Sequence, residues 1–288
     1  ELSNANGISG FEDEVISIAR NRAEDFASIE EDTVRNLYLN RNGNRGAAPV
    51  VMLDAHTDEV GLMVQSIRAN GTINFVTVGG WVPASLVAQK FRIKNRRGEY
   101  IPAVVVSKPP HFTTDNEAGK SLNTQDMYLD VGACNAEETE ETFGIDPGAP
   151  VVPDVDFYFN ENNATMIGKA FDCRIGCAAV LETMAALNSL QLDMDVVGTL
   201  TSQEEIGLRG VQVAARRVVP DVAIIFEGTP GDDTFREPKE AQAALAKGTQ
   251  IRHMDSSLIS NPRFVAFARR IAEKADIVFQ DAVRIKGG

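Results

Sequence analysis

The sequence predicts an α/β fold in which a mostly parallel sheet is interrupted by a smaller β domain. Short apolar runs alternate with helical periodicity on both sides of residues 66–159, as in βαβ units. Residues 66–159 instead contain alternating polar and apolar segments separated by Gly, Pro and Asn turns. We therefore expect a discontinuous α/β domain, residues 1–65 and 160–288, with residues 66–159 inserted as a second domain.

The elements of the α/β domain follow from their apolar spacing. Ser9 and Glu12 have the spacing of a capping box, so a helix is expected to begin there. Residues 50–55 are typical of a buried central strand, and its C-terminal end delivers His56. The other expected elements are strands at 34–39, 196–201, 222–226 and 277–285 and helices at 174–190, 207–218 and 262–275.

Composition and charge exclude several classes of function. The 288 residues are 43% hydrophobic and 24% charged, which is typical of a globular protein and argues against disorder. The formal net charge of −13 argues against nucleic-acid and membrane partners, and no apolar run is long enough to span a bilayer. The N-terminus lacks a signal-peptide pattern and three cysteines form no even disulfide framework, so a cytoplasmic protein is expected.

Four segments place an acid or an imidazole at the C-terminal end of an apolar strand or just beyond it. They are residues 54–59, 171–174, 203–207 and 226–228. Because strand ends at one edge of a sheet converge, these side chains are expected to lie close together. One His among several carboxylates suits Zn²⁺, Co²⁺ or Mn²⁺, so the pattern predicts a metal site.

Each candidate also has an ordinary structural explanation. A lone His such as His56 is more often a hydrogen-bonded structural residue, but Asp58 is placed to accept its second ring N–H. Asp172 precedes a helix and has the position of an N-cap. Glu204 and Glu205 fit the start of a solvated helix, although adjacent carboxylates beside other acids repel one another unless cations compensate.

Several other polar residues are expected to be structural. Glu227 has the alternative of a loop carboxylate, and Asp232 and Asp233 are expected in an exposed turn. Two further histidines, His111 and His253, are assigned no part in the site. Cys173 and Cys177 have no Cys or His partner at the spacing of a zinc motif.

At these residues the sequence resembles the glutamyl aminopeptidase family of dinuclear metallopeptidases. The resemblance implies a zinc-peptidase α/β domain with an inserted β-barrel dimerisation domain, and assembly into a tetrahedral homododecamer. It also implies removal of N-terminal residues, Glu or Asp in particular, from peptides. The matching segments run in the family's order over nearly the whole chain: residues 9–12, 55–61, 79–81, 130–133, 168–174 and 204–210.

The resemblance also implies a role for each site residue. Two divalent ions per subunit, Zn or Co, are expected. The implied metal ligands are His56 and Glu227 for the first ion, the bridging Asp172, and Glu205 for the second ion. Glu204 is implied to be the general base, and Asp58 to orient His56. The family supplies a final His after a Gly-Gly-Thr-Asp stretch, which begins here at Gly287 and Gly288, so the sequence is expected to continue.

Two alternatives stay open at this stage. One is a metal-dependent deacylase or carboxypeptidase of the same broad clan, and the other is an inactive subunit that assembles or binds peptides. Activity on free-amine substrates separates the first, and metal content separates the second. The insertion is expected to be a subunit contact, with Trp81, Val82 and Leu86 as apolar positions beyond the needs of a small barrel.

Overall fold

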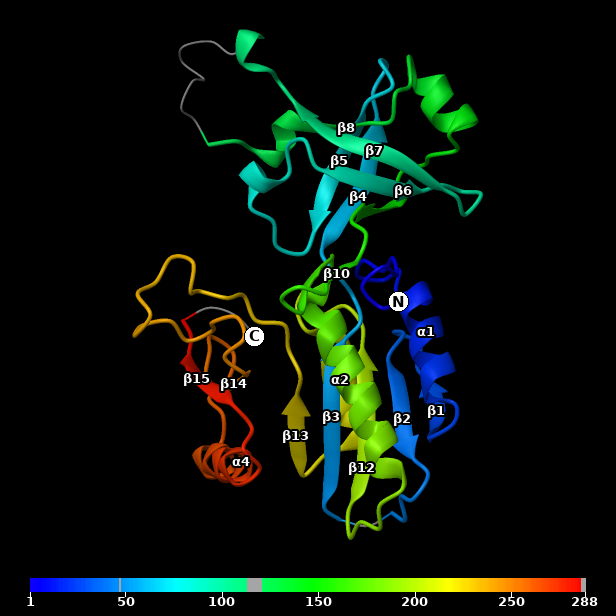
Figure 1. The fold of residues 1–288 in the computed structure, drawn as a ribbon. Helices are drawn as coiled ribbons and strands as arrows, with labels where there is room; N and C mark the ends of the chain where they lie inside the picture. Colours follow the sequence, from blue (N-terminus) through cyan, green and yellow to red (C-terminus); the bar gives the residue numbers. More distant parts are fainter. Residues whose placement is uncertain (47, 113–120, 286–288) are drawn as a thin grey trace. The chain divides into compact units, whose positions relative to one another are not determined.

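The computed structural model describes residues 1–46, 48–112 and 121–285, in two compact units, Glu1–Gly228 and Thr229–Gly288. The first unit contains a five-stranded sheet in which β3 lies between β12 and β13 and pairs in parallel with both (Figure 1). The strands β1 and β2 are antiparallel, so the sheet is mixed. In sheet order the strands are β1 (Ala27–Glu31), β2 (Leu37–Arg41), β12 (Asp195–Thr201), β3 (Val50–His56) and β13 (Val222–Ile225).

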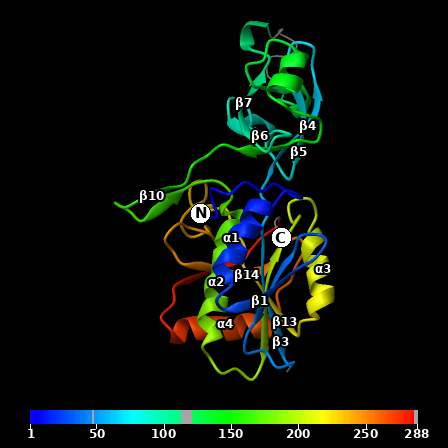
Figure 2. The same ribbon diagram turned by 90° about the vertical axis from the view of Figure 1, so that its right-hand side faces the viewer.

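Helices cover both faces of this sheet. Figure 2 shows α1 (Asp13–Ala23) and α2 (Phe171–Asn188) on one face and α3 (Arg209–Val218) on the other. Alternate side chains of β2 serve the two faces, because successive residues of a strand point in opposite directions. Leu37 and Leu39 join the core under α1 and α2, whereas Tyr38 packs with Ala214 of α3.

The register of the parallel strands brings their C-terminal ends to one edge. His56 at the end of β3 is opposite Thr201 at the end of β12. Ile225 at the end of β13 is opposite Asp54. The α/β architecture predicted from the sequence is confirmed, and this edge carries the acidic segments.

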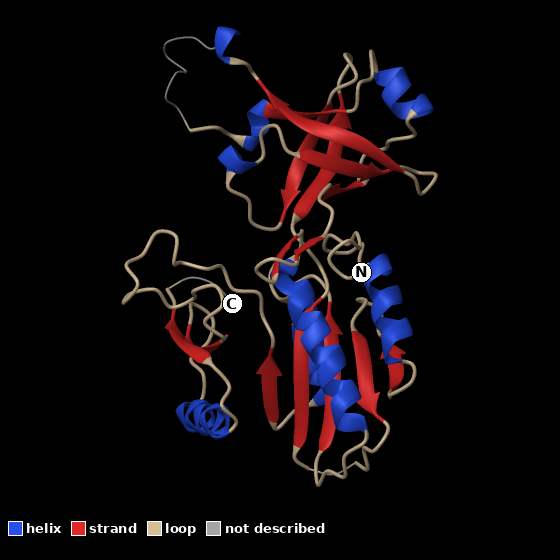
Figure 3. Ribbon diagram, viewed as in Figure 1, coloured by secondary structure: helices blue, strands red, loops and turns tan. Residues whose placement is uncertain are grey.

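The inserted region closes into a six-stranded barrel (Figure 3). Its apolar interior includes Leu62, Phe91 and Ile93, all fully buried. In chain order the strands are β4 (Gly61–Ile67), β5 (Ile73–Val78), β6 (Lys90–Lys94), β7 (Tyr100–Ser107), β8 (Met127–Asp130) and β9 (Pro150–Pro153). The first strand of the barrel, β4, begins at Gly61, five residues before the predicted start of the inserted domain at residue 66. The domain bounds of residues 66–159 stay a prediction.

Two of the three apolar residues expected on the barrel's surface are part of its core. Leu86 is fully buried, and Trp81 packs against the same cluster and donates from Nε1 to Gly61 O at 3.0 Å. Val82 is 68% exposed, as expected. The error arose because closing a barrel of short strands uses apolar residues from its connecting loops as well.

The second unit pairs β14 (Thr249–Met254) in parallel with β15 (Phe279–Val283) and contains α4 (Pro262–Lys274). Asn261 caps α4 by accepting from the N–H groups of Arg263 and Phe264. Asp232 is buried rather than exposed, because it accepts from Ala243 N at 2.9 Å and from Arg284 at 2.7 Å.

Several expected elements are shifted or incomplete. The strand expected at 34–39 begins at Leu37, and α2 begins at Phe171 rather than 174. β1 and the hairpin of β10 (Tyr158–Asn160) and β11 (Thr165–Ile167) were not expected. Within the described residues, every helix is too short or too polar to cross a membrane.

The capping box expected at the first helix is wrong. α1 begins at Asp13, and its N-cap residue Glu12 makes no side-chain capping bond within the described chain. Ser9 instead donates to Asp58, and Glu12 accepts from the N–H groups of Gly10 and Gln203. Contacts with distant segments therefore replaced the local cap.

Candidate metal site

The structure brings together the five residues expected to be metal ligands or the base. Together with Cys173, these residues form two groups that share His56. Within each group, one potential ligand atom of each residue lies within 4.8 Å of those of the others. One group holds His56, Asp172, Cys173 and Glu227, and the other holds His56, Glu204 and Glu205. We call His56, Asp172, Glu204, Glu205 and Glu227 the carboxylate cluster.

His56 is the centre of this cluster. Its side chain is 2% exposed, and Nε2 lies 2.9 Å from Asp172 Oδ1, 3.4 Å from Glu227 Oε1 and 3.9 Å from Glu204 Oε2. The other ring nitrogen, Nδ1, lies 3.1 Å from the backbone oxygen of Asp58 and 3.4 Å from its Oδ1. Nδ1 thus faces Asp58, and Nε2 faces the carboxylates.

Asp58 connects the two halves of the site. It is fully buried, and its Oδ1 accepts from Glu204 N at 2.9 Å while Oδ2 accepts from Glu205 N at 3.1 Å. Burial alone would raise the pKa of Asp58, but His56, Ser9 and the Glu204 N–H hold it below its usual value. Asp58 is therefore an ionised acceptor that fixes the peptide carrying Glu204 and Glu205.

Asp172 is part of the site rather than an N-cap. Ala170 is the N-cap residue of α2, and Asp172 has φ −83° and ψ 105°, outside the helical region. Its side chain is 57% exposed, and its Oδ1 contacts His56 Nε2. Gly228 permits this approach, because an added Cβ there would lie 2.6 Å from Asp172 Cα.

Cys173 lies in the site, which sequence reasoning missed. Its Sγ donates to Phe226 O at 3.0 Å, and burial raises the pKa of the thiol well above its usual range. A thiol that stays protonated is a poor metal ligand, since the thiolate is the form that binds. Its position directly after Asp172 was the available signal, but only the non-helical backbone of Asp172 and Cys173 turns it inward.

The carboxylates repel one another. Burial, with repulsion from Glu227 and Asp58, raises the pKa of Glu204 to about 7. Burial and Asp172 raise the pKa of Glu205 to about 8. Burial would lower the pKa of His56, but its hydrogen bonds with Asp172, Asp58 and Glu227 raise it. At Glu204 and Glu205 burial is the largest cause, and the surrounding negative charge adds to it.

The donor set fits divalent metal ions. One imidazole nitrogen and several carboxylate oxygens are ligands that Zn²⁺ and Co²⁺ accept. Burial is the main cause that raises the pKa of Glu204 and Glu205, and a divalent cation would offset the repulsion that adds to it. The segment expected to lead to a further His starts at Gly287 and Gly288, which lie outside the described residues.

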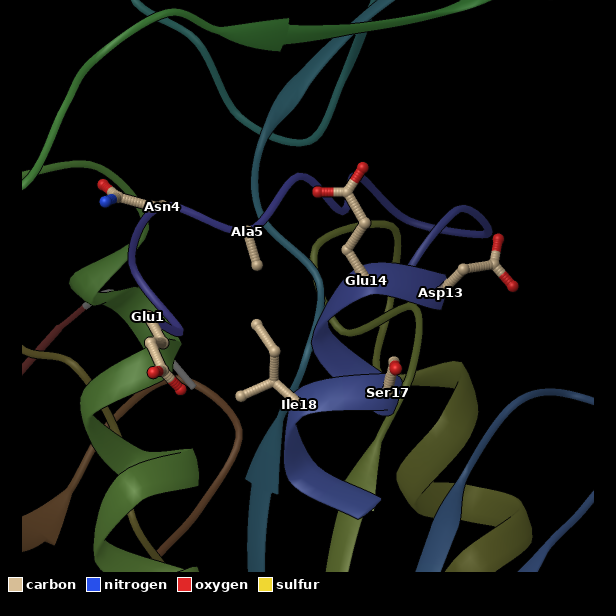
Figure 4. A pocket seen from close by; sticks show the side chains of 7 residues that line it. All are labelled: Glu1, Asn4, Ala5, Asp13, Glu14, Ser17 and Ile18. Atoms are coloured by element: carbon tan, nitrogen blue, oxygen red, sulfur yellow. The ribbon is translucent and has the colours of Figure 1, made fainter. Parts of the chain in front are cut away.

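The other histidines lie elsewhere. His111 is exposed in the barrel region, and Nε2 of His253 lies 2.7 Å from Asp281 Oδ1 in the second unit. A hollow of about 640 Å³ near the N-terminus contains no predicted site residue (Figure 4). Its acid Glu14 already accepts from Tyr100 at 2.6 Å and Asn6 N at 2.8 Å. The chemistry is therefore assigned to the strand ends.

Comparison with known proteins agrees with this geometry. The sequence model of the family described as M42 glutamyl aminopeptidase matches residues 36–288. The glutamyl aminopeptidase of Lactococcus lactis is 32% identical over 289 residues, which cover 100% of this chain and 80% of that protein. The lysyl aminopeptidase of Pyrococcus furiosus is 32% identical over 285 residues, which cover 95% of this chain and 77% of that protein.

Solved structures share the fold. A TET aminopeptidase from a marine sediment Thaumarchaeota archaeon has a TM-score of 0.93 at 35% identity, covering 100% of this chain and 80% of that one. The TET1 peptidase of Pyrococcus horikoshii, which can assemble into a tetrahedron or a large octahedral shell, has a TM-score of 0.87 at 27% identity, covering 100% and 83%. The chain therefore belongs to the M42 glutamyl aminopeptidase family of metal-dependent enzymes, and it is an aminopeptidase that hydrolyses peptide bonds.

Proposed function

We propose that this aminopeptidase uses two divalent ions, Zn or Co, held by the carboxylate cluster. His56 and Glu227 would hold the first ion, Glu205 would hold the second, and Asp172 would be a ligand of both. When bound, the ions lower the pKa of water and polarise the scissile carbonyl. The observation that carries the proposal is the convergence of His56 with carboxylates from three separate segments: Asp172 at the start of α2, Glu204 after β12 and Glu227 after β13.

Glu204 is the general base in this proposal. Its Oε2 accepts a proton from the attacking water and later passes it to the nitrogen of the leaving amine. Asp58 keeps Glu204 in place through the backbone N–H rather than by touching the substrate.

The substrate binds with its free N-terminus toward the cluster. Carboxylates there attract the α-ammonium group, which favours removal of one residue at a time. Gly79, at the end of β5, lies beside Glu205, since an added Cβ would be 3.3 Å from Glu205 Cβ. The peptide carrying Gly79 is thus placed to border the bound residue.

The decisive experiment combines metal analysis with substrate comparison. Purified protein should contain or take up about two equivalents of Zn²⁺ or Co²⁺ per chain. It should hydrolyse a free peptide but not its N-acetylated form. Preference for the acetylated peptide would favour a deacylase, and failure to take up metal would favour an inactive subunit.

The proposed preference for N-terminal Glu or Asp comes from the family resemblance. Relatives of equal identity are a glutamyl and a lysyl aminopeptidase, so overall similarity does not decide it. Aminoacyl p-nitroanilides of Glu, Asp, Lys and Leu should be compared by kcat/KM. Faster cleavage of the Lys or Leu substrate would contradict an acidic preference.

We also propose that the inserted domain, residues 66–159, mediates self-association, with a homododecamer as the expected assembly. Two valines of the barrel region are exposed: Val76, in β5, is 43% exposed, and Val82, in the loop after β5, is 68% exposed. A combined Val76→Asp and Val82→Asp variant should lower the molar mass measured by light scattering. Val213→Asp, an exposed valine of α3, is the control. A wild-type chain that is monomeric at micromolar concentration would contradict the proposal.

A further inference from the structure

A hydroxyl from the N-terminal segment reaches the back of the site. Ser9 is 5% exposed, and its Oγ donates to Asp58 Oδ2 at 2.5 Å. These residues are far apart in the sequence and belong to different segments. Ser9 also precedes residues 36–288, the part that the family's sequence model matches.

The Asp58 carboxylate has its acceptor positions filled. Oδ1 faces Glu204 N and His56 Nδ1, and Oδ2 faces Glu205 N and the Ser9 hydroxyl. An ionised carboxylate offers about four lone-pair sites, so each contact restrains its rotation. Ser9 is the contact among these that is not itself part of the site, and it fixes the carboxylate from outside.

The segment that carries Ser9 is itself held firmly. Gly7 O accepts from Glu59 N at 2.9 Å, and Gly7 N donates to Glu59 Oε1 at 3.1 Å. Arg174 donates to Ala5 O at 3.0 Å and to Gly7 O at 3.2 Å. Lys169 donates to Ala5 O at 3.0 Å. We call Glu59, Lys169 and Arg174, all buried, the anchor cluster.

The anchor cluster links Ser9 to both sides of the site. Glu59 directly follows Asp58, whereas Lys169 and Arg174 flank Asp172 in the sequence. The same two segments that present Asp58 and Asp172 therefore hold the backbone that presents Ser9. A hydroxyl placed in this way has little freedom to leave Asp58.

We propose that Ser9 is a positioning residue that fixes the Asp58 carboxylate and thereby the metal-binding geometry of His56 and Glu205. This inference rests on the metal site of the proposed function. Ser9 is not a nucleophile of the Ser-His-Asp kind, because in that arrangement the serine contacts the histidine rather than the aspartate.

The test measures Co²⁺ binding to metal-free protein by calorimetry. Ser9→Ala should weaken Co²⁺ binding about tenfold, the lower end of the range for residues that orient metal ligands. It should lower kcat with little change in KM. Ser3→Ala is the matched control, because Ser3 lies in the same segment, is 8% exposed and donates to Lys169 O at 2.7 Å. Equal Co²⁺ affinity in Ser9→Ala and Ser3→Ala would overturn the proposal.

A double-mutant cycle tests whether Ser9 acts through Asp58. The Ser9→Ala, Asp58→Asn protein should bind Co²⁺ no more weakly than Asp58→Asn alone. Additive losses would overturn the proposal. Wild-type protein that binds no Co²⁺ would overturn the proposed function and this inference together, whereas normal binding with an unchanged Ser9→Ala overturns only the inference.

A crystal structure of the metal-loaded wild-type protein provides a check that needs no variant. Ser9 Oγ should stay within hydrogen-bond distance of Asp58 Oδ2, roughly 2.5–3.0 Å. A separation beyond about 3.5 Å would overturn the proposal even if Ser9→Ala does not fold.

Discussion

Asp58 and Glu59 are adjacent in the sequence, yet they belong to two differently balanced groups of buried charge. Glu59 belongs to the anchor cluster, where its Oε1 lies 2.5 Å from Lys169 Nζ and 3.4 Å from Arg174 Nη2. Arg174 Nη1 also donates to the backbone oxygen of Leu2 at 2.8 Å. Backbone carbonyls accept further N–H groups of the two cations, although Arg174 Nε has no hydrogen-bond partner among the described residues. Asp58 instead supports the carboxylate cluster, which has four carboxylates and one imidazole.

The difference explains which group needs an added ion. In the anchor cluster each charged side chain has an opposite charge beside it, and backbone carbonyls solvate the two cations further. In the carboxylate cluster the carboxylates repel one another, and the pKa values of Glu204 and Glu205 rise to about 7 and about 8. Structural charge and functional charge are thus distinguished by whether the protein itself balances them.

The largest expected effect comes from breaking the carboxylate cluster at its bridge. Asp172→Ala should remove both ions, from about two equivalents per chain to nearly none, because both ions would lose a carboxylate ligand. Activity should be lost with them. Metal content after dialysis measures this, with Asp146→Ala, which changes a half-exposed carboxylate paired with Arg96, as the control. Retention of one tightly bound ion with activity would show that Asp172 does not bridge.

The second prediction separates base from ligand within the same cluster. Glu204→Gln should keep its metal but lower kcat by about 10²–10⁴, because the amide cannot accept the proton. Glu205→Gln should instead lose metal. Steady-state kinetics on metal-saturated protein, with metal content measured in parallel, checks both variants. A decrease in kcat smaller than about tenfold would rule out Glu204 as the base.

The third prediction breaks the anchor cluster. Glu59→Gln leaves Lys169 and Arg174 without their carboxylate, so the metal-free protein should lose about 3–5 kcal/mol of unfolding free energy. Glu182→Gln breaks the exposed pair with Arg22 and should cost less than about 1 kcal/mol. Urea unfolding compares them, and equal losses would mean that the buried cluster contributes no more than a surface pair.

The fold and most of the candidate site could be predicted because strand ends obey a general rule. His56 could be predicted because it ends the buried strand β3. The parallel register places Thr201 opposite His56, and Glu204 comes three residues after Thr201. Cys173 and Ser9 could not be placed in this way. Cys173 depends on a non-helical start of α2, and Ser9 on a contact with Asp58 that competes with a local cap. A local sequence pattern does not reveal whether a side chain bonds to its own helix end or to a residue far away in the sequence.

The smallest expected effect concerns Glu12, which lies behind the site. It is fully buried, and its Oε1 accepts from Gly10 N at 2.8 Å and Gln203 N at 3.3 Å. Within the described chain, Oε2 has no hydrogen-bond partner. Burial is the main cause that raises the pKa of Glu12 from 4.5 to about 7, and repulsion from Asp58 adds to it despite the N–H donors.

Because the pKa of Glu12 is higher in the folded protein, its contribution to stability is complete below pH 4.5 and is lost as the pH rises through about 7. Glu12→Gln does not ionise, so the metal-free variant should gain stability relative to wild type between pH 5 and pH 8. The gain should be at most about 3 kcal/mol, since one pKa unit corresponds to about 1.4 kcal/mol. Urea unfolding at each pH measures this difference, with Glu24→Gln, an exposed residue at the end of α1, as the control for removing one charge. A difference that does not change with pH would show that Glu12 ionises equally in the folded and unfolded chain.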